Sequence, residues 1–252
     1  FAAAYGSIHC FKYLLLNNSE IDKFSLYYAV SGGNYEIIRT IDQYYTQENF
    51  EIDFYNDATR KKNLNGYLDP IVPAIYKHQN DLFDWILQEK YINKGETGIR
   101  LSKLLPVISM NGNAHSLIEL INNGLDLNAV IDVLFCKSIG LASFGGFYKY
   151  IQLFYSFIEK PKFLAKKNIE NSVILGNLSI FKFIIQKDQR YTQNFNDTLF
   201  IAIDKNHFNI IKFIVENYFK DDIKLTSKGL YKCLQLAMKF NSDVFRYLIN
   251  NF

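Results

Sequence analysis

Cysteine and histidine are the first side chains to consider in this sequence as metal ligands, bases or nucleophiles. The three cysteines, Cys10, Cys136 and Cys233, lie far apart, and no CxxC pair or suitably spaced histidine accompanies them. Their odd number and wide spacing favour free thiols in a reducing, cytoplasmic compartment. Cys10 falls in an apolar helical segment, where we expect a buried and inert thiol.

The histidines and glycines form no catalytic or phosphate-binding motif. The strings HExxH, GxSxG and GxxxxGK[ST] do not occur, and the glycines of 140–145 are misplaced for a phosphate loop. Asp221 and Asp222 precede a lysine-rich turn and are typical of a loop or a helix cap. Each histidine lies at a predicted turn or in the first turn of the next helix: His9, His78, His115 and His207. We therefore expect structural histidines, no catalytic residue, and no cofactor or metal.

Composition indicates an ordered chain without a strong electrostatic field. Hydrophobic residues make up 49% and charged residues 21% of the 252 positions, and the 22 Phe and 18 Tyr supply bulky apolar area. The net charge is only +3 and two basic clusters, 60–62 and 160–167, are typical of solvated loops or helix ends. The uncharged run 138–148 is shorter than the roughly 20 residues of a spanning helix, so we expect no membrane span.

An internal repeat organises the chain. One apolar residue follows each predicted turn, and successive copies are about 33 residues apart on average. These anchor residues are Phe11, Ile38, Phe83, Leu117, Ile151, Phe181, Ile211 and Phe245. Before each anchor stands a pair that forms a turn, as in Gly112-Asn113, and nine positions before most anchors stands a small residue such as Ala74. The apolar residues after each turn recur at helical spacing, which predicts short amphipathic helices.

The repeat predicts an all-α solenoid of about seven or eight stacked helix–turn–helix units. Residues 1–45 contain two units and residues 66–252 contain the others, while the polar segment 46–65 is a linker or insertion. We expect Asp69 to cap the first helix after that segment, with Pro70 in its first turn. The sequence starts inside a unit, so we expect it to be a piece of a longer protein.

The units resemble ankyrin repeats, in particular a divergent ankyrin-like domain that is expanded in some protists. The resemblance is carried by AAAYGSIHCFKYLLLNN at 2–18, AVSGGNYEIIRTI at 29–41, HQNDLFDWIL at 78–87 and NNGLDLNA at 122–129, and DPIVPA at 69–74 stands in place of the family's T-P-L-H-x-A. It implies a curved stack of helix pairs that binds other proteins and has no catalytic residues. It also implies that a turn histidine such as His207 bonds to neighbouring backbone.

The resemblance further implies that the two residues before each turn face the concave side of the stack. Several of these positions are unexpectedly apolar, and an exposed apolar stripe is typical of an interface. We expect a partner protein to bind at Tyr76, Lys77, Met110, Asn111, Phe144, Ile174, Asp204 and Lys205. In the alternative register, which is shifted by one residue, these side chains pack between helices.

The leading functional hypothesis is therefore a protein-interaction scaffold without enzymatic activity. One alternative is a regulatory or targeting segment of a larger enzyme. A second is a nucleic-acid binder that reads one base per helical repeat, but this class needs a basic groove and polar residues at fixed positions. A third alternative is a host-interacting effector, which would act in a different location but would bind its partner through the same physical interactions.

Overall fold

The structure, a computed structural model, describes residues 1–22, 24–47, 69–95, 98–159, 166–187, 195–219, 227–240 and 242–252. All regular elements within these ranges are helices, which confirms the all-α prediction. The chain forms two compact units, Phe1–Leu125 and Asp126–Phe252. Most of the predicted linker 46–65 lies outside the described residues.

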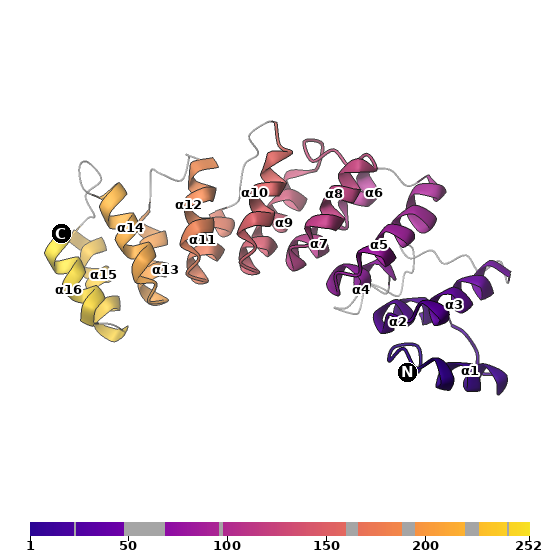
Figure 1. Cartoon of the computed structure of the whole chain (residues 1–252). Helices are drawn as coiled ribbons and strands as arrows, with labels where there is room; N and C mark the ends of the chain where they lie inside the picture. The colour runs from indigo at the N-terminus through magenta and orange to yellow at the C-terminus, as the bar shows by residue number, and fades with distance from the viewer. Residues whose placement is uncertain are drawn as a thin grey trace. The chain divides into compact units, whose positions relative to one another are not determined.

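Both units are built from short helices joined in sequence (Figure 1). Unit 1 contains α1 (Ile8–Leu16), α2 (Ser25–Gly32), α3 (Tyr35–Gln47), α4 (Ile71–Tyr76), α5 (Asn80–Ile86), the π-helix η2 (Leu87–Tyr91), the 3-10 helix η3 (Ile92–Lys94), α6 (Gly98–Ser102), α7 (Leu105–Asn111) and α8 (Ala114–Asn122). Unit 2 contains α9 (Asp132–Phe144), α10 (Tyr148–Ser156), α11 (Lys166–Ile174), α12 (Leu178–Lys187), α13 (Asn196–Asp204), α14 (Phe208–Tyr218), α15 (Ser227–Phe240) and α16 (Ser242–Asn251).

The helices pack as pairs, and each pair packs on the next pair of its unit. In unit 1 the first helices α2, α4 and α7 contact one another in succession, and each also packs on the helix that follows its turn. In unit 2 the first helices α9, α11, α13 and α15 do the same. The helix–turn–helix element that the sequence predicts is therefore present in both units. At the N-terminus residues 2–6 form turns in place of a first helix, so α1 stands as the second helix of its pair.

The predicted anchors form the core inside each unit. Seven of them are buried: Phe11, Ile38, Phe83, Leu117, Ile151, Phe181 and Ile211. In the last helix the anchor position is only half-buried at Phe245, whereas Val244 is 1% exposed. The small residues predicted on the first helices are also enclosed, with Ala29 and Ala74 at 0% exposure, because a methyl group lets neighbouring helices approach closely.

The turns between the two helices of the first seven pairs share one backbone feature. One residue in each of these turns has positive φ: Gly6, Gly33, His78, Gly112, Gly146, Gly176 and Asn206. The next backbone N–H closes the turn on the first helix, as when Asn113 N donates to Ile108 O at 3.1 Å. This is the left-handed C-terminal cap that glycine and asparagine favour, so the predicted Gly-Asn turns are confirmed. The predicted cap at Asp69 is confirmed too, because its Oδ1 accepts from Ile71 N at 3.0 Å.

The prediction that Cys10 is buried is wrong. Cys10 is exposed on α1, and Phe11 beside it is the residue of that helix that enters the core. The reason is that α1 packs against α3 along one narrow face, so the neighbouring apolar positions Tyr13 and Leu16 are 67% and 83% exposed. Cys233 is the cysteine that is fully enclosed, and burial raises its pKa to about 12.

Iodoacetamide at pH 8 is expected to modify Cys10 in the folded chain and to leave Cys233 unmodified. Only the thiolate is reactive, and burial both shields Cys233 and keeps it protonated. In urea both residues should react. Peptide mapping by mass spectrometry measures the two extents of alkylation, and equal rates in the folded chain would contradict the described burial.

Candidate protein-binding surfaces

In five pairs, those that contain Tyr76, Met110, Phe144, Ile174 and Asp204, the position just before the turn is exposed because the residue preceding it faces the core. Ile75, Ser109, Ser143, Val173 and Ile203 are at most 1% exposed. The next residue along each helix is rotated about 100° away from the core by helical geometry. The following residues are therefore at the surface: Tyr76 and Met110 at 46% exposure each, Phe144 at 63% and Ile174 at 40%. The alternative register, in which these side chains pack between helices, does not hold.

In unit 1 the exposed position belongs to a larger aromatic cluster. The Tyr76 hydroxyl lies 3.8 Å from the Met110 Sδ, which joins α4 to α7. Tyr27 and Tyr28 on α2 meet edge to face, with ring centroids 5.4 Å apart. Burial raises the pKa of Tyr27, and the neighbouring Tyr28 and Tyr76 hydroxyls raise it further. We call these four residues, Tyr27, Tyr28, Tyr76 and Met110, the tyrosine surface.

The polar residues predicted beside this surface already have internal partners. The Lys77 ammonium group donates to the Ser31 carbonyl oxygen, which ties the end of α4 to the end of α2. Asn111 Nδ2 donates to the Val107 carbonyl of its own helix at 2.8 Å. The two side chains therefore brace the edge of the tyrosine surface, and Lys77 remains an exposed cation there.

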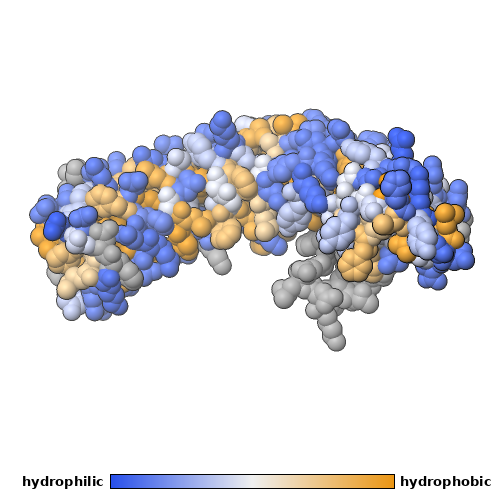
Figure 2. All heavy atoms as spheres, turned by 60° about the horizontal axis from the view of Figure 1, so that its bottom comes forward, coloured by the Kyte–Doolittle hydropathy of each residue, from blue (hydrophilic) through white to orange (hydrophobic). Residues whose placement is uncertain are grey.

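Unit 2 presents a second apolar surface at the same structural position. It consists of Phe144 at the end of α9 and Ile174 with Leu175 at the end of α11, and Leu175 is 40% exposed. On the next pair the position becomes polar, where Lys205 Nζ lies 3.1 Å from Asp204 Oδ2. Figure 2 brings forward the lower side of Figure 1 and shows apolar patches among polar residues on that side. We call Phe144, Ile174 and Leu175 the unit-2 apolar surface.

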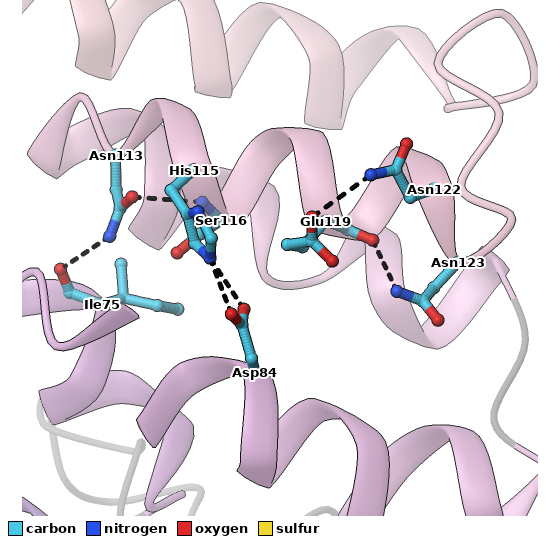
Figure 3. Close-up of polar contacts among 8 residues, drawn as sticks. All are labelled: Ile75, Asp84, Asn113, His115, Ser116, Glu119, Asn122 and Asn123. Atoms are coloured by element: carbon cyan, nitrogen blue, oxygen red, sulfur yellow. Dashed lines mark hydrogen bonds and ion pairs between the residues drawn. The ribbon is translucent and has the colours of Figure 1, made fainter. Parts of the chain in front are cut away.

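Two of the histidines, His115 and His207, make contacts between neighbouring pairs of helices. His115 Nε2 lies 2.8 Å and 3.0 Å from the two Asp84 oxygens, which joins α8 to α5 (Figure 3). Ser116 follows His115 directly, so its side chain leaves the helix in another direction, and its buried Oγ has no hydrogen-bond partner. These residues therefore do not form a nucleophile–base pair. His207 Nε2 lies 2.9 Å from the Ile174 carbonyl oxygen, so the predicted backbone contact of the turn histidine is confirmed.

Asparagines at the turns make a contact that sequence reasoning missed. Asn113 Oδ1 accepts from Ser116 N at 3.1 Å and its Nδ2 donates to the Ile75 carbonyl of the preceding pair at 3.3 Å (Figure 3). Asn34, two pairs earlier, makes a similar set of contacts: its Oδ1 accepts from Ile37 N at 3.2 Å and its Nδ2 donates to the Gly6 carbonyl of the preceding pair at 3.1 Å. One side chain thus caps its own helix and fixes the distance to its neighbour. The signal in the sequence was the asparagine after the turn glycine.

Replacing Asn113 with alanine is expected to lower the free energy of unfolding by about 1–3 kcal/mol, because it removes a helix cap and leaves the Ile75 carbonyl without this donor. Asn122→Ala is the matched control on the same helix, since Asn122 is exposed and should change stability by less than about 0.5 kcal/mol. Urea denaturation followed by circular dichroism measures both. Equal losses in the two variants would show that the contact between pairs contributes nothing.

Comparison with known proteins adds no assignment: no protein-family model and no curated protein matches the chain. Over the described ranges, no three His, Cys, Asp or Glu side chains gather in a way that could hold a metal ion. The helices described here also include none with the length and apolar character to cross a bilayer. The two exposed apolar surfaces are features of the described residues from which a function can be proposed.

Proposed function

We propose that the chain is a divergent ankyrin-like solenoid that binds a partner protein through the residues at the ends of its first helices. The observation that carries the proposal is the repeated exposure of large apolar side chains at one structural position. Tyr76 and Met110 occupy it in unit 1, and Phe144 and Ile174 occupy it in unit 2. Exposed apolar patches of this kind favour association with another protein, because binding removes them from water.

The chemistry of the two surfaces favours a protein partner over a nucleic acid. The tyrosine surface combines three phenol rings with a thioether, and aromatic residues and Met are enriched at protein interfaces. Lys77 and Lys205 are the cations of the predicted set, and each already contacts an internal oxygen atom. Rigid helix ends would hold the aromatic anchors in place, so little conformational entropy is lost on binding. The free cysteines support a reducing compartment for this interaction.

The test compares substitutions of Tyr76 and Phe144 with substitutions of apolar residues elsewhere that are even more exposed. Tyr76→Ser and Phe144→Ser are each expected to weaken binding to an affinity-recovered partner at least about tenfold, since aromatic anchors dominate interface energies. The controls are Leu16→Ser in unit 1 and Val133→Ser in unit 2, whose side chains are 83% and 78% exposed. Interferometry with the purified partner measures the affinities. If Tyr76→Ser and Phe144→Ser bound like the wild-type chain, or if the controls lost as much affinity as these two variants, the assignment would be refuted.

A further inference from the structure

A groove runs between α3 and α5 in unit 1, away from the positions that precede the turns. It has a volume of about 460 Å³, within the range of ligand-binding clefts. The first helices of these two pairs, α2 and α4, pack closely on each other, whereas α3 and α5 do not. The groove is the space between the second helices. The residues that decide its chemistry are Tyr35, Ile38, Arg39, Asp81, Leu82 and Trp85.

The groove has an apolar floor and an aromatic wall. Ile38 and Leu82 are 2% and 3% exposed, so their side chains present a packed apolar base. Trp85 is half-buried on α5, and Tyr35 on α3 is 53% exposed. Trp85 is the single tryptophan of the chain. A residue with an apolar side chain could therefore rest on this floor against the indole ring.

One charged contact at the groove is already satisfied within the chain. The Lys90 ammonium group forms an ion pair with Asp42, which also lines the groove, and lies 5.6 Å from the centroid of the Trp85 ring. The Lys90 and Asp42 side chains are only 19% and 25% exposed. Asp42 is therefore not available to a partner's cation, and the charge that remains to be matched comes from other residues.

The charges left to a partner are one cation and one anion on opposite walls. Arg39 on α3 and Asp81 on α5 are both exposed, and neither side chain forms an ion pair or hydrogen bond with any residue that the structure describes. A polyanion would be repelled by Asp81, and a polycation would be repelled by Arg39. The complementary occupant carries both signs, with an apolar group between them for the floor.

We propose that this groove binds a short extended segment of a partner protein in which an apolar side chain is flanked by one acidic and one basic residue. The acidic residue pairs with Arg39, the basic residue pairs with Asp81, and the apolar side chain covers Ile38 and Leu82 beside Trp85. This site goes beyond the function proposed above, because it uses the second helices and does not include Tyr76, Met110, Phe144 or Ile174.

The single tryptophan makes the site directly observable in the full chain. The probes are four capped nine-residue Gly/Ser peptides with a central Leu and one charged residue two positions before it and another two positions after it. In the two mixed-charge peptides the charged residues are Asp then Lys, or Lys then Asp. In the two like-charge peptides they are both Asp or both Lys. One or both mixed-charge peptides are expected to change Trp85 emission saturably, and to bind about fivefold more tightly than the like-charge peptides. Replacing the central Leu with Ser should abolish the change.

Charge reversal in the protein supplies the decisive comparison. Asp81→Lys should transfer preference to the peptide with two Asp residues, and Arg39→Glu should transfer it to the peptide with two Lys residues. Lys149→Ala, at an exposed position on α10 in unit 2, should bind the mixed peptides as the wild-type chain does. Circular dichroism checks that each variant is folded. Equal affinity for all charge patterns, no saturable emission change with either mixed peptide, or preferences that do not move with the reversals would overturn the proposal and leave the test of Tyr76 and Phe144 unaffected.

Discussion

Replacing Gly32 with alanine is expected to detach the N-terminal segment from the rest of unit 1 and to lower its stability by about 3 kcal/mol. A Cβ at this position would lie 2.0 Å from the Ala3 carbonyl oxygen and 2.8 Å from Gly6 N. Both contacts are with backbone atoms, so a change of side-chain rotamer cannot relieve them. Either α2 or the turn at 1–6 must move, and the contacts that hold α1 in place are lost with it.

Gly95→Ala is the matched control for this substitution. Gly95 has a φ of 75° and nothing lies within 4 Å of the position that a Cβ would take, so alanine there meets only backbone strain of about 1 kcal/mol. Hydrogen exchange of the α1 amides reports detachment, and urea denaturation reports the stability of each variant. If Gly32→Ala were no more destabilising than Gly95→Ala, the close approach of α2 to the N-terminal turn would be wrong.

Replacing Phe181 with alanine is expected to cost about 3–5 kcal/mol, because it leaves a cavity the size of a ring in the core of unit 2. Phe181 is fully buried on α12, and its ring meets those of Phe195 and Phe213 edge to face, with centroids 6.2 Å and 6.0 Å away. These contacts join α12 to the start of α13 and to α14. The loss should therefore extend to the next pair of helices.

Phe144→Ala removes the same ring from a surface position and serves as the comparison. Phe144 is 63% exposed, so its loss should change the free energy of unfolding by less than about 0.5 kcal/mol. Urea denaturation followed by circular dichroism measures both variants, and hydrogen exchange shows whether α13 and α14 loosen in Phe181→Ala. Comparable losses at the two positions would contradict the assignment of core and surface in unit 2.

The local pattern of each helix pair was predictable from sequence because it depends on neighbouring residues. The anchor after each turn and the glycine with positive φ follow from helical spacing and from steric limits on the backbone. The last pair shows how sensitive the register is. In α16 the buried position is Val244 instead of the predicted Phe245, and this shift of one residue corresponds to about 100° of rotation about the helix axis.

Contacts between pairs were not predictable, because they depend on how closely two pairs approach. The bonds from Asn34 to Gly6 and from Asn113 to Ile75 require carbonyl oxygens of another pair at a fixed distance. The groove at Trp85 lies between α3 and α5, which do not pack closely on each other although α2 and α4 do. The exposure of Cys10 likewise reflects the narrow contact of α1 with α3. The hydrophobic pattern of the sequence does not predict these distances between helices.

The central claim is that the residues at the ends of the first helices bind a partner protein, and hydrogen–deuterium exchange of the full chain with and without the recovered partner tests it most directly. We predict slower exchange at the turns that follow Tyr76, Met110, Phe144 and Ile174, and unchanged exchange at the turns that follow the second helices. Protection confined to the second helices, or no protection at any of these four turns, would contradict the claim.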